Sequence, residues 1–316
     1  MKEIGGYLEL EEFCHQEYYP DLIALNTARN ALLYLCRARK IRKLYLPYYL
    51  CDSVSNICNR EGINYEYYHI HDDFTPIFNG VLKDGEYIYI VNYFGQLKRQ
   101  YLNEYKMNFG NIIVDNVQAF FEQPIEGTDT IYSCRKFFGV PDGAYLSTNA
   151  KSLVLETDVS KGRMKHILGR YEGIVASEYY ADFKTNDHSF VELELKSMSK
   201  LTHNLLGAVD YDKVMRRRNE NWLSLHGGLM GKNKLRLSLT NAPYMYPFYC
   251  EDGIKMRKIL SERKIFIPTL WPNVLEFTGC ELEKDYVMNI LPLPCDQRYT
   301  REDMERIIEE IQKCIS

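Results

Sequence analysis

An acid and an amine stand at the ends of two short apolar segments, where they could act together on a bound ligand. Asp115 is the last residue of NIIVD (111–115), and Lys136 follows TIYS (130–133) by three residues. If both segments are strands of an open α/β sheet, their carboxyl ends lie at the edge where such sheets bind ligands. A buried carboxylate is costly without a cation nearby, so Asp115 predicts a positively charged partner.

Lys136 has the surroundings that make an amine nucleophilic. It follows Arg135 and precedes Phe137-Phe138-Gly139, and an apolar setting lowers the pKa of an amine from about 10.4 toward neutrality. A neutral amine can condense with a carbonyl group to form an imine. Two plainer interpretations stay open, because aspartate is also a preferred helix N-cap and most lysines lie in solvent.

Three other groups of residues could carry chemistry, and each has a plainer explanation. Ser133–Lys136 reads S-x-x-K, as in serine β-lactamases, but neither S-D-N nor K-T-G accompanies it. His69 and His71 would share one face of a strand and two acids follow, but no third metal ligand is fixed by spacing, so a polar strand exit is favoured. The basic run 216–218 has apolar residues around it, which favours a solvated helix face over a phosphate site.

The composition is that of a globular protein without a bias toward polyanions. The chain has 316 residues, 46% of them hydrophobic and 26% charged, with a formal net charge of −4, which argues against nucleic acid as a partner. No apolar run approaches the roughly 20 residues that cross a bilayer, so no membrane embedding is expected. Nine cysteines without a C-x-x-C pair, and a start without an apolar signal core, indicate a reducing cytoplasm.

The first two thirds of the chain alternate between helical and strand patterns, which predicts an α/β domain with a mostly parallel sheet. The strand segments are short, apolar and bounded by Gly, Asn or Asp, as expected for a sheet covered on both faces. Helices are predicted at 26–39 and 52–60, and strands at 43–47, 65–70, 87–93, 111–115 and 130–133.

Beyond about residue 195 the pattern changes to one long helical segment, 197–229, whose apolar residues recur at three- and four-residue steps and which ends at Gly227-Gly228. The predicted organisation is an N-terminal arm and a large α/β domain over residues 1–212, followed by a small α+β domain over 213–316. The tail predicts a strand at 243–250, a helix at 253–264, strands at 265–271 and 287–294, and a terminal helix capped by Thr300.

Taken in order, these segments resemble the DegT/DnrJ/EryC1/StrS family, the sugar-aminotransferase-like branch of the fold-type I enzymes that use pyridoxal phosphate (PLP). LNTARNALLYL resembles the family's N-S-G-T/R-x-A-L, VDNVQAF its E-D-x-A-Q/H-A, and SCRKFFGVPDGAYL its S-F-x-x-x-K-x-x-x-x-G-E-G-G. Near the end of the chain, NILPLPCDQRYTREDMERIIEEI resembles L-P-x-x-x-x-x-T-x-E-D. The resemblance implies the aspartate-aminotransferase-like fold and a homodimer.

The resemblance also implies a role for each residue of a PLP site. Lys136 would hold the cofactor as a Schiff base and later carry the substrate proton. Asp115 would keep the pyridine nitrogen protonated, and Gln118 would hydrogen-bond the phenolic oxygen. No metal belongs to the expected site. The groups that would hold the phosphate are the backbone N–H groups of Ala28 and Arg29 and the hydroxyl of Ser133.

Three features depart from the family pattern. Ala28 stands where the family usually has Gly, and Cys51 stands where many members have the aromatic residue that stacks on the ring, which makes Tyr49 a candidate for that role. Residues 195–198 replace the N-x-R-M segment that carries an asparagine from one subunit to the phosphate of the other. Lys196 or His203 of the partner subunit could supply that contact instead.

The expected reaction is the transfer of an amino group from an amino acid, with glutamate as the first candidate, to a keto group on a sugar or a similar small metabolite. Because the residues that hold the ring are shared among PLP chemistries, dehydration or another carbanion reaction stays open. A non-catalytic protein on the same scaffold is the third possibility, which the replaced asparagine favours. The presence of Lys136, Asp115 and Gln118 favours an enzyme.

Overall fold

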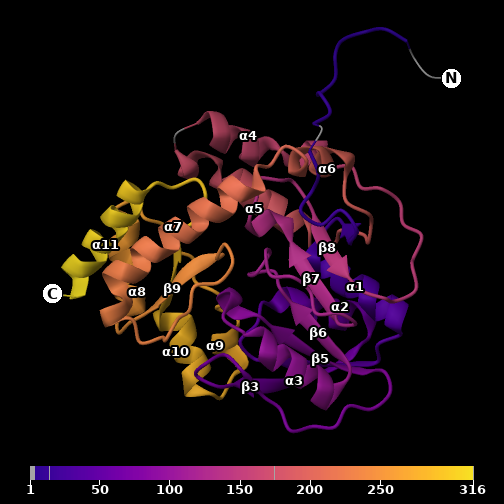
Figure 1. Cartoon of the computed structure of the whole chain (residues 1–316), viewed down its shortest axis with the longest axis horizontal. Coiled ribbons are helices and arrows are strands. Elements are labelled where there is room, and N and C mark those ends of the chain that lie inside the picture. Colours follow the sequence, from indigo (N-terminus) through magenta and orange to yellow (C-terminus); the bar gives the residue numbers. More distant parts are fainter. Residues whose placement is uncertain (1–3, 14, 174, 316) are drawn as a thin grey trace.

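The computed structural model describes residues 4–13, 15–173 and 175–315. It shows a large sheet with helices on both faces, and beside it a smaller group of elements from the C-terminal third of the chain (Figure 1). None of the helices in these three ranges combines the length and the apolar character needed to cross a bilayer.

The large sheet has eight strands in the order β1-β8-β7-β6-β5-β2-β3-β4. Its five central strands, from β7 to β3, run parallel to their neighbours, whereas β8, β1 and β4 pair antiparallel. Every residue of β6 and β7 is buried, as expected for strands that are covered on both faces. The strands are β1 (Ile23–Leu25), β2 (Lys43–Pro47), β3 (Asn64–Ile70), β4 (Pro76–Ile77), β5 (Glu86–Val91), β6 (Ile112–Asp115), β7 (Asp129–Ser133) and β8 (Ala144–Ser147).

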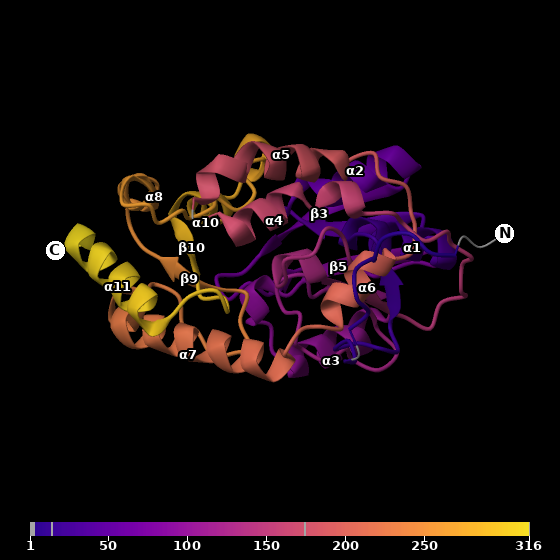
Figure 2. The ribbon, with the colours of Figure 1, turned by 90° about the horizontal axis from the view of Figure 1, so that it is seen from above.

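Helices α1 (Ala28–Arg39), α2 (Asp52–Glu61) and α3 (Arg99–Phe109) connect the strands and cover the sheet. α2 and α3 lie on opposite faces of it (Figure 2). α1 begins where the side chain of Thr27 accepts a hydrogen bond from the N–H of Asn30, and it ends at Lys40 in the left-handed conformation. Its central residues, from Asn30 to Cys36, are buried against the sheet.

The segment after β8 is built from short helices, and a long helix then leads into the C-terminal elements. The short helices are α4 (Lys165–Glu172), α5 (Tyr180–Ser189) and α6 (Lys200–Leu206). The C-terminal elements α7 (Tyr211–Leu229), α8 (Gly253–Glu262) and α11 (Arg301–Ile315), with the antiparallel pair β9 (Met245–Tyr249) and β10 (Ile290–Pro294), enclose a hydrophobic core of their own. Helices α9 (Val274–Phe277) and α10 (Glu281–Asn289) instead bury Val274, Tyr286 and Val287 in the core of the large sheet.

The structure confirms the expected α/β architecture and each of the predicted central strands to within two residues at either end. The predicted division of the chain after residue 212 stays a prediction. The strand expected at 87–93 ends at Val91, because a 3-10 turn, Tyr93–Gly95, follows directly after Asn92, whose side chain donates a hydrogen bond to Asn116. Strands β1, β4 and β8 and helices α3, α4, α5, α9 and α10 were not foreseen.

The single long helix predicted over 197–229 is wrong, because the structure has two helices there. α6 ends before Gly207, and α7 has a new N-cap, Asp210, whose side chain accepts the N–H of Lys213. Gly228 lies inside α7 and does not end it. A side chain at this position would clash with α11, because an added Cβ would lie 2.7 Å from Cδ1 of Ile308.

The predicted strand at 265–271 is also wrong. Ile265 and Ile267 are buried in the C-terminal core, but this segment pairs with no strand in the described part of the chain. Lys264 and Trp271, at its two ends, have left-handed φ values of 63° and 57°, which turn the chain away from an extended path. In the strand predicted at 287–294, the first three residues instead complete α10.

The interpretation of residues 216–218 as a solvated helix face is wrong for Arg218, which is only 1% exposed. Its guanidinium donates hydrogen bonds to the backbone oxygens of Pro243 and Phe137 at 2.9 and 3.2 Å and to the side chain of Gln297 at 2.8 Å. It also lies 4.5 Å from the ring centroid of Phe137. Burial lowers the pKa of Arg218. This one side chain therefore joins α7 to the turn that carries Lys136.

We expect Arg218→Met to lower the free energy of unfolding by about 3 kcal/mol or more, because the oxygens of Pro243, Tyr244 and Gln297 lose their guanidinium donor. The matched control is Arg217→Met. The Arg217 side chain is 40% exposed and pairs with Glu220 at 3.6 Å on the helix surface, so its loss should change stability by no more than about 0.5 kcal/mol. Urea denaturation of both variants measures the difference, and equal losses would contradict the role given to Arg218.

Candidate cofactor site

Asp115 lies at the carboxyl end of β6 with its carboxylate held on both sides. Oδ1 accepts the backbone N–H of Val117 at 2.8 Å, and Oδ2 accepts the hydroxyl of Tyr89, on the neighbouring strand β5, at 2.7 Å. The alternative of a helix N-cap is wrong, because the next regular element after β6 is β7. The acid instead closes a tight turn and faces the edge where the parallel strands end.

Charge and burial oppose each other at Asp115. The residue is only 4% exposed, and burial raises the pKa of its carboxyl. The positive charge of Lys136, the N–H of Val117 and the hydroxyl of Tyr89 each act to lower that pKa. Lys136 is therefore the cation whose charge acts on Asp115, although the two side chains form no ion pair within the described part of the chain.

Lys136 ends a short 3-10 turn, Cys134–Lys136, that follows β7 directly. Burial lowers the pKa of its amine, while the charge of Asp115 and a thiolate at Cys51 would raise it. The ring centroid of Tyr244 lies 5.5 Å from Nζ. The Lys136 side chain is partly buried and forms no ion pair with the residues that the structure describes, unlike the solvated lysine of the plainer interpretation.

Gln118 is buried and uses only half of its hydrogen-bonding capacity. Oε1 accepts the N–H of Phe94 at 2.8 Å, whereas Nε2 is buried and has no partner within the described ranges. Phe94 has a left-handed φ of 53°, a conformation that costs a non-glycine residue about 1 kcal/mol or more. An unpaired buried amide donor costs a further ~1 to 3 kcal/mol, which a ligand acceptor would recover.

The first turn of α1 leaves further donors free. The side chain of Thr27 takes the N–H of Asn30, but the N–H groups of Ala28 and Arg29 have no hydrogen-bond partner in the described structure. Ser133, at the end of β7, also has a hydroxyl without a partner among the described residues. Free N–H groups at the start of a helix form a ready site for an anion such as phosphate.

Arginine side chains near this helix start add positive charge. Burial, together with the charges of Arg29 and Arg163, lowers the pKa of Arg135 to about 10, although Asp187 acts in the opposite direction. The Arg135 guanidinium lies 3.5 Å from Asp187 and 3.9 Å from the ring centroid of Phe190. Arg29 has no ion-pair partner in the described part of the chain. An anion bound here would relieve the mutual repulsion of the arginines.

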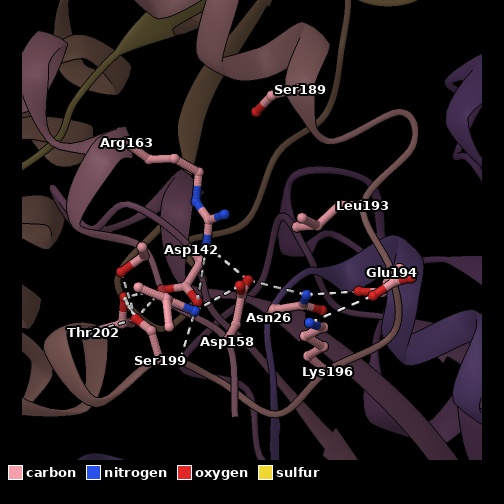
Figure 3. Close-up of polar contacts among 12 residues, drawn as sticks. Asn26, Asp142, Asp158, Arg163, Ser189, Leu193, Glu194, Lys196, Ser199 and Thr202 are labelled. Atoms are coloured by element: carbon pink, nitrogen blue, oxygen red, sulfur yellow. Dashed lines mark hydrogen bonds and ion pairs between the residues drawn. The ribbon is translucent and has the colours of Figure 1, made fainter. Parts of the chain in front are cut away.

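A buried polar network fixes the residue before the helix cap (Figure 3). Asn26 donates to Asp158 at 3.2 Å, and its backbone oxygen accepts the N–H of Gly143 at 2.7 Å. Arg163 binds Asp158 at 2.7 Å. The network extends through Asp142, which accepts hydrogen bonds from Ser199 and Thr202 at the start of α6. These contacts hold the N-terminus of α1 in place against α6 and the segment after β8.

The sequence suggested Lys196 or His203 for the phosphate contact and Tyr49 for stacking on the ring. In the structure all three contact other residues of the same chain. Nζ of Lys196 lies 3.4 Å from Glu156 and from Glu194. His203 contacts Glu17 at 2.6 Å, a contact that raises the pKa of the imidazole. Tyr49 is fully buried, and its ring contacts those of Tyr93, Trp271 and Tyr286.

Several residues of this site were not foreseen: Tyr89, Phe94, Arg135, Arg218 and Tyr244. Tyr89 could have been found, because a parallel neighbour of the 111–115 strand places its polar side chains beside those of that strand. The other four reach the site from turns or from the C-terminal elements, where no local pattern fixes the contact.

No family model and no curated protein matches the sequence. Solved structures match the fold. A DegT DnrJ EryC1 StrS aminotransferase from Brucella abortus is 14% identical, with 92% of this chain and 85% of that chain covered and a TM-score of 0.63. The PLP form of Spr1654 from Streptococcus pneumoniae is 15% identical, with 92% and 86% covered and a TM-score of 0.65.

Helicobacter pylori PseC, an aminotransferase involved in the biosynthesis of pseudoaminic acid, is 14% identical, with 92% of this chain and 85% of that chain covered and a TM-score of 0.63. At such low identity the likeness shows the fold alone. The expected fold, that of the fold-type I sugar aminotransferases, is confirmed.

The pKa shift of Lys136 predicts its reactivity in the protein without cofactor. Because a lowered pKa makes more of the amine neutral at a given pH, Lys136 should be acetylated at lower pH than Lys200, whose pKa its hydrogen bond to Glu12 raises. Peptide mass spectrometry measures the acetylation rate of each lysine across a pH series. Each rate is expressed as a fraction of the highest rate that the same lysine reaches at high pH. Asp115→Asn should move the Lys136 midpoint to still lower pH, because the charge that raises this pKa is gone. A midpoint that stays in place would mean that the two groups do not interact.

Proposed function

We propose that the chain, which has the fold of the DegT/DnrJ/EryC1/StrS aminotransferases, is itself a PLP-dependent aminotransferase. It would move an amino group from an amino acid, with glutamate as the first candidate, to a keto group on a sugar or a similar small metabolite. The observation that carries the proposal is the placement of Asp115 and Lys136 together at the carboxyl edge of the sheet.

The unpaired groups around this pair fit the polar groups of PLP. The free N–H groups of Ala28 and Arg29 and the hydroxyl of Ser133 would hold the phosphate. The guanidinium groups of Arg29 and Arg135 would balance its charge within one subunit. This arrangement would replace the asparagine that the family takes from the other subunit.

The ring would be held by two residues that lie close together in sequence. The carboxylate of Asp115 would keep a proton on the pyridine nitrogen, and Nε2 of Gln118, which lacks a partner in the described structure, would donate to the phenolic oxygen. When bound, PLP supplies an electron sink that stabilises negative charge next to the substrate amine. Tyr89 would hold Asp115 in place through its hydroxyl.

Lys136 would attach the cofactor and then carry the substrate proton. Its lowered pKa keeps more of the amine neutral, which both roles require. Once the amine is attached, a protonated pyridine nitrogen would supply a positive charge beside the buried carboxylate of Asp115.

The assembly and the location are further parts of the proposal. A homodimer is supported by an N-terminal arm that leaves the body of the subunit (Figure 1), with Ile4, Tyr7 and Leu8 more than nine tenths exposed. A reducing compartment such as the cytoplasm is supported by the eight cysteines that the structure describes, all of which are free thiols.

Borohydride reduction of the protein loaded with PLP should fix one cofactor per chain, on Lys136. Peptide mass spectrometry locates the label, and Lys136→Ala should lose it while Lys161→Ala, an exposed control, keeps it. In the wild type, glutamate should bleach the visible absorbance and 2-oxoglutarate should appear. Bleaching with a different product would favour dehydration or another carbanion reaction, and a label on another lysine would refute the assignment.

Asp115→Asn should lower the rate of the glutamate half-reaction by on the order of 100-fold or more, because a neutral amide cannot stabilise a protonated ring nitrogen. The fold should survive, since the amide oxygen can still accept the N–H of Val117 and the amide NH2 group can donate to the hydroxyl oxygen of Tyr89. Stopped-flow absorbance measures the rate, and circular dichroism checks the fold. Asp84→Asn, at a fully exposed side chain, is the matched control and should keep the wild-type rate. A near-normal rate for Asp115→Asn would leave Asp115 with only a structural role.

A further inference from the structure

We infer that His69, Cys280 and Glu283 form a binding site for a thiophilic divalent cation, of which Zn²⁺ fits best. One ligand atom from each residue lies within 4.8 Å of the other two. The site joins β3 of the large sheet to the start of α10, and these elements lie side by side (Figure 1). It is separate from the candidate cofactor site and does not rest on the proposed function.

Glu283 makes the strongest demand for a cation. Its side chain is 0% exposed, and Oε1 accepts the N–H of Ile70 at 3.3 Å and contacts Nδ1 of His69 at 3.0 Å. No lysine or arginine pairs with this carboxylate in the described part of the chain. A histidine supplies positive charge only in its protonated form, whereas a metal ion supplies it at neutral pH. A buried carboxylate without such a charge would be costly.

The three ligands are already held in position by their neighbours. The hydroxyl of Thr278 donates to Oε2 of Glu283 and accepts the backbone N–H of Cys280 at 3.1 Å, so one buried side chain orients both residues. The ring of His69 stacks on that of Tyr48, with 4.5 Å between the centroids and 19° between the planes. Supporting contacts of this kind hold the ligands of metal sites in orientation.

The ligand set selects the metal. An imidazole nitrogen, a thiolate and a carboxylate suit Zn²⁺, whereas Mg²⁺ and Ca²⁺ prefer sets made only of oxygen. Three protein ligands leave the fourth tetrahedral position to water. Binding would convert the Cys280 thiol to the thiolate and release its proton to solvent.

The sequence around His69 and His71 indicated no third metal ligand, because the other two ligands of His69 lie far away in the sequence. Glu283 stands 214 positions after His69. His71 belongs to no group of metal-ligating residues in the described ranges and is exposed. A bound ion would therefore link the C-terminal elements to β3 and stabilise the folded chain by mass action.

The test uses the full-length chain after treatment with a chelator and dialysis. Native mass spectrometry should show one Zn²⁺ per chain, and Co²⁺ should give the charge-transfer absorption of a cobalt-thiolate bond. Cys280→Ser should abolish that absorption and weaken Zn²⁺ binding by about 10-fold or more. Zn²⁺ should raise the Tm of the wild type but not of Cys280→Ser. Mg²⁺ should do neither.

Matched controls separate this site from other ligands on the chain. Cys314→Ser, at another partly exposed cysteine, and His71→Asn should bind Zn²⁺ as the wild type does. Lys136→Ala should also bind Zn²⁺ normally. A failed cofactor experiment would therefore not contradict the Zn²⁺ site, and a failed Zn²⁺ experiment would not contradict the cofactor site. A folded wild type that takes up no Zn²⁺, or equal uptake by the wild type and Cys280→Ser, would overturn the inference.

Discussion

The candidate site depends on one electrostatic constraint, a carboxylate buried at the end of a central strand. Burial raises the pKa of the Asp115 carboxyl, whereas the amine of Lys136, a backbone N–H and a hydroxyl all favour its charged form. The parallel strands β5, β6 and β7 bring these groups to one edge. An amine beside a buried acid also suits covalent attachment of an aldehyde, since burial keeps more of that amine neutral.

Several groups around Asp115 and Lys136 are in unfavourable states in the protein without a ligand. Nε2 of Gln118 is buried without a partner among the described residues, Phe94 has a left-handed backbone, and Arg135 lies among other arginines. Each feature costs free energy in the protein alone. A phosphate and a polar ring would satisfy these groups, so the same features support a preformed ligand site. The buried hydrogen bonds of Asp142 and Asn26 hold the start of α1 in place despite this cost in free energy.

Much of the fold could be predicted, because the central strands are apolar runs bounded by turn residues and the acid and amine follow two of them. The parts that failed depend on contacts between distant residues. Arg218 looks like one of three exposed arginines until Phe137 and Pro243 surround it. The break before α7 is the exception, because it depends on a local contact, the cap that Asp210 provides for Lys213. The ligands near His69 come from a helix that no strong periodicity announced.

The C-terminal elements contact the large domain both at the candidate cofactor site and away from it. Arg218 of α7 donates to the backbone oxygen of Phe137, the residue after Lys136, and Tyr244 lies under the amine itself. Glu283 of α10 holds the end of β3 through Ile70. The turn that carries Lys136 is therefore positioned from the C-terminal side as well as by its own strand. A shift of α7 relative to the sheet would move the amine with respect to Asp115, because the sheet fixes the acid and the α7 contact fixes the turn.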